Sequence, residues 1–397
     1  MQEKQATIYL DNAATTPLDS KVLEAMLPYL KEQYGNASSI HSLGQKAREA
    51  VEKARKKVAF FLNCKESEVY FTPSATFSDN LAILGVVRAA QKGGIKPHII
   101  TSIIEHPAVL ETYKILEKQG VEVTYLSVSK GGLVVIEEIE KAIKENTVLV
   151  SIMLANNEIG TIQPIAEIAN LIKRFKIQDS RFKILFHTDA VQGANYLDLD
   201  VEKLGVDLLT LSGHKIYGPK GIGVLYVKQG TAIEPIIYGG HQEAGLIPGT
   251  ENVANIVGLG KAIELVQSSK LKVQSLRKLR DKLIDGILKE IPQTFLNGSR
   301  EARLPNNVNI SFKGVEGEAL LILLDQEGVA VSTGSACSSG SLEASHVLMA
   351  LNVGNERAHS AIRFSLGKQT IEKEIAKVLE VLPEMVRHLR KISGFRL

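Results

Sequence analysis

Short apolar runs alternate with longer helical patterns over the first three quarters of the chain. Runs of only a few residues, rich in Val, Ile and Leu, are typical of strands that are buried on both faces of a parallel sheet. Seven runs predict strands, at Val69–Phe71, Ile99–Ser102, Val121–Leu126, Val148–Leu154, Ile184–His187, Leu208–Leu211 and Gly223–Val227. The segments between them predict helices, at His41–Leu62, Ser78–Gln91, Ala108–Gln119 and Ile165–Phe175. This alternation favours an α/β fold with a mainly parallel seven-stranded sheet covered by helices.

The last third of the chain has a different pattern and predicts a smaller α+β domain. Helices are expected at Asn252–Gln267, Leu276–Ile291, Gly317–Leu324 and Ile371–Ile392. Strands are expected at Val308–Ser311, Gly328–Val331 and Ile362–Ser365. We therefore expect a large domain over residues 15–255. The small domain would combine residues 1–14 and 256–397, so that the N-terminal strand joins it.

Composition and charge narrow the class of protein. The 397 residues carry 47 Lys and Arg against 44 Asp and Glu, a net charge of +3, which gives no reason to expect nucleic-acid or membrane binding. Apolar stretches such as Val148–Ala155 are far shorter than the ~20 residues that span a bilayer, and the polar start does not match a secretory signal. Two cysteines exclude a disulfide framework or a thiolate zinc site. We expect a cytoplasmic protein with no metal site.

The glycine-rich stretch Ser212–Gly223 carries the strongest chemical signal. Lys215 follows a predicted strand, and a lysine buried there can act as an amine nucleophile. Ser212 and His214 flank it with donors that suit a phosphate. The alternative is an ordinary solvated loop lysine.

Two further strand ends carry side chains that suit a cofactor. Asp189 is costly to bury without a cation, and the protonated ring nitrogen of pyridoxal phosphate is such a cation. His106 could stack on a flat ring and move protons near neutral pH. The alternatives are a helix N-cap for Asp189 and a helix-start or core histidine for His106.

Candidate phosphate and carboxylate sites come from two other segments. Ala75 and Thr76 precede a predicted helix, whose N-terminus would attract a phosphate, although Thr76 or Ser78 could simply cap the helix. Arg363, in a strand-like run, could bind a substrate carboxylate with two hydrogen bonds or take part in an internal ion pair.

The two cysteines have different surroundings. Cys337 lies among Ser, Gly and Ala in Ser332–Ser341, a composition that favours exposure and mobility, so it is a candidate nucleophile. Cys64 follows the apolar run Val58–Leu62 and is expected to fill a core.

Taken together, these motifs resemble the pyridoxal-phosphate cysteine desulfurases of the NifS/IscS type, in the class V aminotransferase family. The resemblance covers nearly the whole chain. It is carried by Tyr9–Pro17, Ala75–Asn80, Glu105–His106, Asn156–Gly160, His187–Gln192, Ser212–Gly221, Pro248–Asn252 and Ser332–Ser341. It implies the fold type I (aspartate-aminotransferase-like) architecture and a homodimer. It also implies an extended, mobile cysteine loop.

The resemblance also implies a role for each matching residue. Lys215 would bind the cofactor covalently and move the Cα proton, His106 would stack on the ring, and Cys337 would take the sulfur. The remaining cofactor contacts would come from Ala75, Thr76, Asn157, Asp189, Gln192, Ser212, His214 and, from the neighbouring subunit, Thr250. Asn36 and Arg363 would hold the substrate carboxylate.

The implied activity converts L-cysteine to L-alanine and leaves a persulfide on Cys337 for a sulfur acceptor. An iron–sulfur scaffold or a tRNA-thiolation protein would be such an acceptor. Two alternatives stay open, selenocysteine lyase activity and a degenerate homologue that acts as a sulfur-relay or assembly scaffold. Four residues depart from the usual family pattern, namely Ala37, Ser74, Phe77 and Ile247. Phe77 and Ile247 are the two that motivate the scaffold alternative.

Overall fold

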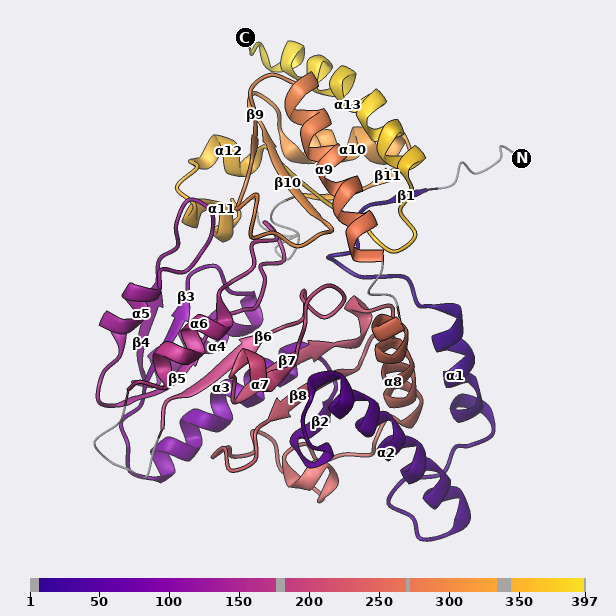
Figure 1. Ribbon diagram of the computed structural model, residues 1–397, viewed down its shortest axis with the longest axis vertical. Helices are drawn as coiled ribbons and strands as arrows, with labels where there is room; N and C mark the ends of the chain where they lie inside the picture. The colour runs from indigo at the N-terminus through magenta and orange to yellow at the C-terminus, as the bar shows by residue number, and fades with distance from the viewer. Residues whose placement is uncertain (1–6, 176–182, 269–271, 334–343, 396–397) are drawn as a thin grey trace.

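A seven-stranded sheet forms the centre of the larger part of the molecule (Figure 1). The computed structural model describes residues 7–175, 183–268, 272–333 and 344–395. The strands lie in the order β2-β8-β7-β6-β5-β3-β4, in which β8 runs antiparallel to both β2 and β7 and the other neighbouring pairs are parallel. Their bounds are β2 Val69–Thr72, β3 His98–Ser102, β4 Glu122–Leu126, β5 Thr147–Ser151, β6 Leu185–Asp189, β7 Leu208–Ser212 and β8 Gly223–Val227. The predicted α/β fold with a mainly parallel seven-stranded sheet is confirmed.

Successive residues along the central strands enter two different apolar cores. Leu149 and Leu208 pack into the core beneath α3 and α4, whereas the next residues, Val150 and Leu209, pack into the core on the other face. This two-residue period is the reason that these strands contain continuous apolar runs. The helices of this part are α1 Ser20–Lys31, α2 Ser42–Leu62, α3 Ala75–Lys92, α4 Pro107–Lys118, α5 Ile136–Ala142, α6 Ile165–Ile172, α7 Val201–Leu204 and α8 Val253–Ser268.

The start of α3 differs from the sequence prediction. The helix was expected from Ser78, but it begins at Ala75, because the hydroxyl of Ser74 accepts the Phe77 N–H at 3.1 Å and caps the helix. Thr76 and Ser78 therefore lie inside the first turn, and neither is its cap.

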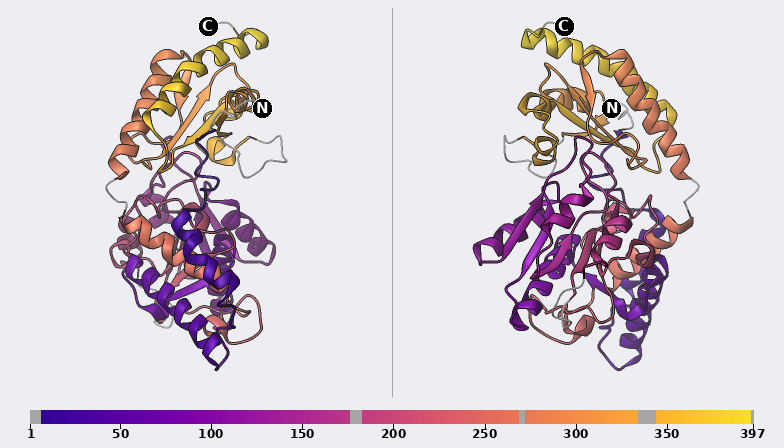
Figure 2. Two further views of the ribbon diagram at one scale, coloured as in Figure 1. Left: turned by 90° about the vertical axis from the view of Figure 1, so that its right-hand side faces the viewer. Right: turned by 60° about the vertical axis from the view of Figure 1, so that its left-hand side comes forward.

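A second sheet, in the order β12-β13-β10-β9, lies above the first in Figure 1 and has its own apolar core. Its strands are β9 Thr294–Leu296, β10 Asn307–Phe312, β12 Ser332–Thr333 and β13 Ala361–Ser365. The helices of this region are α9 Lys272–Glu290, α10 Gly317–Gln326, α11 His346–Ala350, α12 Asn355–His359 and α13 Glu372–Ser393. Figure 2 shows α9 and α13 side by side on the outside of this sheet.

The first residues of the chain connect the two parts. β1 (Ile8–Tyr9) pairs in parallel with β11 (Val329–Ala330), and Leu10 enters the apolar core of the second sheet. Residues 11–19 then cross to the first sheet, where α1 begins. We call residues 11–19 the N-terminal connector.

Helix α8 packs with the larger part. Its residues Ile256, Leu259 and Ile263 lie in the core that α1 and α2 also enter, so the expected boundary at 255/256 falls within this helix.

Among the described residues, each helix is either too short or too polar to cross a lipid bilayer.

Candidate active site

A cavity of about 480 Å³ opens at the carboxyl ends of the parallel strands, between the large sheet and β13. This is where an open α/β sheet places ligands. Ten of the candidate residues line it: Ala75, Thr76, His106, Asn157, Asp189, Gln192, Ser212, His214, Lys215 and Arg363. The structure therefore brings together residues that are far apart in the sequence.

Lys215 ends a short 3₁₀ turn directly after β7, and its amine points into the cavity wall made by the N-terminal connector. Its Nζ donates hydrogen bonds to the backbone oxygens of Ala13 and Ala14, at 2.6 and 2.7 Å. Asn195 fixes the turn by donating to the Lys215 backbone oxygen at 2.6 Å. The alternative of a solvated loop lysine is therefore wrong.

Asp189 is the last residue of β6 and is 8% exposed. One of its oxygens accepts the Val191 N–H at 2.9 Å in a local turn, and the next helix, α7, begins only at Val201, so the alternative of a helix N-cap is wrong. Burial raises its pKa to about 6, although Lys215 and the Val191 N–H oppose this shift. A carboxylate in such a position is stabilised by a cation.

Asp79, from α3, is a second buried carboxyl group in the cavity wall. It is 1% exposed, and its Oδ1 has no hydrogen-bond partner among the described residues. Burial and the nearby Asp189 raise its pKa well above the ordinary value. Both shifts have burial as their main cause, and the Lys215 charge and the Val191 N–H counteract it only at Asp189.

His106 caps α4, and this contact sets the position of its ring proton. The Nδ1 atom accepts the Ala108 N–H at 3.1 Å, which assigns the proton of the neutral ring to Nε2. Burial and the charges of Lys215 and His346 lower the His106 pKa to about 4, so the ring is neutral at physiological pH. The helix-start alternative is correct, and it is compatible with a place in the cavity.

The end of the cavity beside α3 is rich in groups that bind anions. The N–H groups of Ala75 and Thr76 lie in the first helical turn, where they have no acceptor within the helix. Ser212, His214 and Lys220 also line the cavity, and the His214 ring contacts the Thr15 hydroxyl at 3.1 Å. This donor set suits a phosphate.

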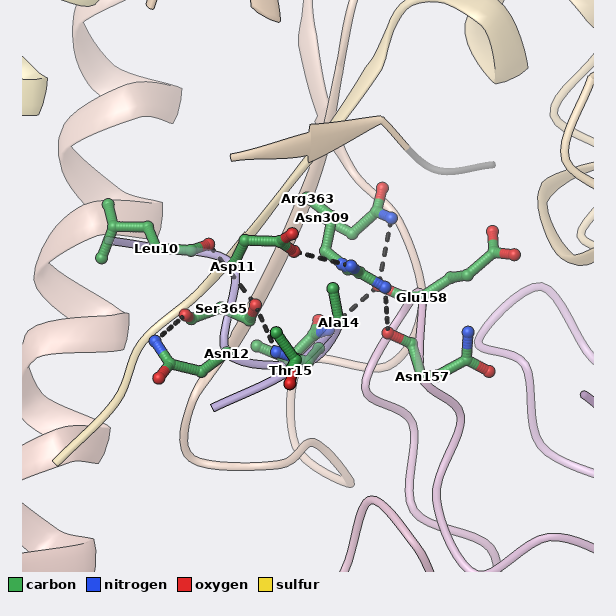
Figure 3. Close-up of polar contacts among 12 residues, drawn as sticks. Leu10, Asp11, Asn12, Ala14, Thr15, Asn157, Glu158, Asn309, Arg363 and Ser365 are labelled. Atoms are coloured by element: carbon green, nitrogen blue, oxygen red, sulfur yellow. Dashed lines mark hydrogen bonds and ion pairs between the residues drawn. The ribbon is translucent and has the colours of Figure 1, made fainter. Parts of the chain in front are cut away.

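Arg363 lies on β13 and lines the cavity from the side of the second sheet. Its Nη2 lies 2.8 Å from Asp11 Oδ1, and its Nη1 donates to the Asn157 backbone oxygen at 3.1 Å (Figure 3). The internal ion pair that the sequence left open is therefore present. Its Nε has no partner among the described residues.

Among the described residues, two candidates, Asn36 and Thr250, do not line this cavity. Cys337 falls outside the described residues. Asn36, between α1 and α2, is exposed and accepts the Ser38 N–H at 2.8 Å, and Thr250 is exposed beyond η3 (Gln242–Gly245). Their assignments stay predictions.

The departures from the family pattern have structural explanations. Ser74 caps α3, as described above. Ile247 is a buried member of the apolar core beneath α3, and the partly buried Phe77 packs against the same core. The Ala37 side chain is buried.

Sequence reasoning missed several residues of the cavity wall. Ala13, Ala14 and Thr15 contribute through the connector, and Asp79 contributes a carboxyl group. Asp11 lies behind this wall, where it pairs with the lining residue Arg363. Asp11 did leave a signal, because it interrupts the first apolar stretch of the chain.

Pyridoxal phosphate fits this donor set. The cavity offers an amine at Lys215, a buried carboxylate at Asp189 and an anion-binding end beside α3. These are the three groups that the aldehyde, the ring nitrogen and the phosphate of this cofactor require. Fold and site together define a pyridoxal-phosphate enzyme of fold type I.

Comparison with known proteins identifies the family. The model for "Aminotransferase class-V" matches residues 8–378, and the chain belongs to this family. "Cysteine desulfurase IscS" of Dictyoglomus turgidum is 51% identical over 390 residues, covering 98% of this chain and 97% of the relative. The protein of the same name from Methanosarcina thermophila is 51% identical over 387 residues, with 97% and 93% covered.

Solved structures agree with this assignment. A NifS-like protein superposes with a TM-score of 0.89 at 40% identity, covering 96% of this chain and 100% of that one. A NifS-like protein from Rickettsia africae gives a TM-score of 0.84 at 32% identity, covering 96% and 99%.

Proposed function

We propose that this chain is a cysteine desulfurase, which removes sulfur from L-cysteine to give L-alanine and a persulfide on Cys337. The observation that carries the proposal is the meeting of Lys215, Asp189 and His106 in one cavity. Relatives that are 51% identical over nearly the whole chain are named cysteine desulfurases.

The cofactor would be held by residues that already face the cavity. When bound, pyridoxal phosphate supplies an electron sink for a carbanion at the substrate Cα. Lys215 would supply the amine for the aldehyde, Asp189 would pair with the ring nitrogen, and Gln192 would donate to the ring oxygen. The first turn of α3, with Ser212 and His214, would bind the phosphate. Asn157 would contact the ring.

Proton movement would fall to Lys215 and His106. With the cofactor bound, the Lys215 amine would be the group that takes the Cα proton of the substrate. The backbone oxygens of Ala13 and Ala14 in the N-terminal connector accept hydrogen bonds from Nζ and keep it beside the cavity. His106 stays neutral above about pH 4 and therefore presents an Nε2–H donor beside the ring position.

Cys337 is the proposed sulfur acceptor within the chain. Its described flanks support this role, because one contacts a lining residue of the cavity and the other contacts Glu158, the neighbour of the lining residue Asn157. On one side, Ser332 pairs with Arg363 across β12 and β13. On the other side, the Ser345 hydroxyl donates to the buried Glu158 carboxylate. The thiolate is the nucleophile that attacks the substrate sulfur.

The other cysteine is not a competitor. Cys64 packs against the large core, as the sequence predicts, and burial raises its pKa to about 12. Its thiol therefore stays protonated and unreactive.

A homodimer would complete the site. Thr250 and Asn36 lie apart from the cavity of their own chain, but their neighbours Glu251 and Ala37 line one open hollow of about 750 Å³. We propose that this surface faces the partner subunit, where Thr250 reaches the phosphate and Asn36 the substrate carboxylate.

The persulfide would pass to a cytoplasmic acceptor protein, such as an iron–sulfur scaffold or a tRNA-thiolation protein.

The proposal is tested with Cys337→Ala and the matched control Cys64→Ala. We expect wild type and Cys64→Ala to release L-alanine and form a persulfide from L-cysteine. Cys337→Ala should lose persulfide formation while it keeps the visible absorbance of the bound cofactor. A Cys337→Ala protein that released sulfide at the wild-type rate would contradict the nucleophile assignment. Purified wild type without visible cofactor absorbance would favour the scaffold alternative.

A further inference from the structure

The Arg363 guanidinium faces the cavity while it is already bound to a carboxylate. Its side chain is 1% exposed, and it shares the cavity with Lys215 and His106. A guanidinium binds a carboxylate best through two parallel N–H donors. In Figure 3, Asp11 and the Asn157 backbone oxygen occupy its two terminal nitrogens from different sides.

Asp11 is held in this position by the backbone around it. It forms a parallel bridge with Ser365, two residues after Arg363, and its backbone oxygen accepts the Tyr9 hydroxyl at 3.1 Å. The carboxylate itself is 20% exposed, so it is less buried than the arginine that it pairs with. A fixed backbone with a partly exposed carboxylate allows the side chain to leave Arg363 without disturbing the fold.

We propose that Asp11 competes with the substrate carboxylate for Arg363 and so sets the affinity for the amino acid. The inference rests on the proposed function, in which Arg363 holds that carboxylate. Two carboxylates on one guanidinium repel each other, so a bound substrate must displace or share the Asp11 contact at Nη2. Asp11 therefore raises KM without touching the reacting atoms.

Among the described residues, Asp11 is the acid that forms an ion pair with Arg363. Glu158 is the nearest alternative acid, but its carboxyl group accepts the Ser345 hydroxyl. Asn309, opposite Arg363 on β10, donates to the Glu158 backbone oxygen at 3.1 Å. Neither side chain makes an ion pair with the guanidinium.

The test uses Asp11→Asn in the holoenzyme, because asparagine keeps an oxygen for Nη2 and removes only the charge. We expect KM for L-cysteine to fall about three- to tenfold with no increase in kcat. Binding of L-alanine, followed by the visible absorbance of the cofactor, should tighten by a similar factor. L-Alaninamide, which lacks the carboxylate, should bind both proteins equally well.

Two controls separate this inference from the proposed function. Asp19→Asn removes another connector carboxylate, which pairs with Lys368 away from the cavity, and should change none of these constants. Arg363→Gln should weaken L-alanine binding. If Asp11→Asn leaves KM unchanged or raises it while Arg363→Gln weakens binding, the competitor role is wrong and the substrate site stands. If Arg363→Gln has no effect, the substrate-site assignment fails and the competitor role fails with it.

Discussion

Four buried carboxyl groups lie in the cavity wall or next in sequence to a lining residue, and all have raised pKa values because burial disfavours their charged forms. They are Asp79, Glu105, Glu158 and Asp189. Glu105 is fully buried, with a pKa raised to about 8, and it lies beside His106. Its Oε1 accepts the Ser102 hydroxyl and the Met153 N–H, whereas Oε2 has no partner among the described residues. Near neutral pH, Glu105 is therefore an uncharged acid.

Replacing Glu105 with Gln should remove a pH-dependent loss of stability. The pKa is about 8 in the folded chain and near 4.5 when unfolded, so the unfolded chain releases the proton first. Wild-type stability therefore falls as pH rises from about 4.5 to about 8. Between pH 5 and pH 9, Glu105→Gln should gain more than about 1 kcal/mol of unfolding free energy relative to wild type in urea titrations.

The exposed Glu111→Gln variant is the matched control for this titration and should show no such gain. A difference between Glu105→Gln and wild type that stays constant with pH would show that Glu105 titrates at an ordinary value.

For single residues, the sequence was most informative where side chains carry the chemistry. Lys215, Asp189 and His106 follow strands within distinctive motifs, and all three line the cavity. The hydrogen-bond acceptors for Lys215 are backbone oxygens of Ala13 and Ala14, which any residue could supply. No sequence signal reports such a contact, so it could be found only from the structure.

Elements that are buried on both sides were predicted more reliably than elements on the surface. Five strands of the large sheet, β3, β5, β6, β7 and β8, are buried throughout, and their apolar runs record burial on two faces. Helix α1 was missed, since it contains Pro28 and leaves Leu23, Leu27 and Leu30 exposed. The short helices α11 and α12 depend on tertiary contacts, because five residues cannot form a stable helix alone.

The capping of α3 gives a prediction for a single element. Ser74→Ala should destabilise the protein by about 1 kcal/mol, because the Phe77 N–H loses its acceptor at the helix start. Ser74→Gly should cost only a few tenths of a kcal/mol, because glycine is itself tolerated at a helix N-cap. Thermal or urea unfolding measures both values. Equal losses for the two variants would show that the hydroxyl does not stabilise the helix.

At the scale of the whole molecule, the cavity belongs to both sheets. Lys215 and Asp189 come from the large sheet, while Arg363 comes from the second one. Asn307, on β10, donates to the Glu158 backbone oxygen at 2.9 Å and holds the loop that carries Asn157. The relative position of the two parts therefore fixes the distance between the cofactor end and the carboxylate end of the cavity.

The proposed dimer is tested by mixing two defective chains. If Thr250 acts across the interface, a mixed dimer of Lys215→Ala and Thr250→Val contains one intact site and one doubly defective site. Activity at limiting cofactor should then exceed the sum of the two separate proteins and approach about half of the wild-type value per mixed dimer.

The control mixes Lys215→Ala with Asp189→Asn. Both residues line the same cavity of one chain, so every site of this mixed dimer has one defect and no rescue is expected. The absence of rescue with Thr250→Val as well would place Thr250 outside the neighbouring site.

The N-terminal connector has a consequence for how the protein is made. It is synthesised early, yet its partners come much later: Lys215 lies 201 positions beyond Ala14, and Arg363 lies 352 positions beyond Asp11. Contacts of such long range form slowly, because the intervening chain must first be ordered. A nascent chain that has not reached β13 has no complete wall for this cavity. Cofactor loading should therefore follow release of the finished polypeptide, which makes a visible chromophore a reporter of completed folding.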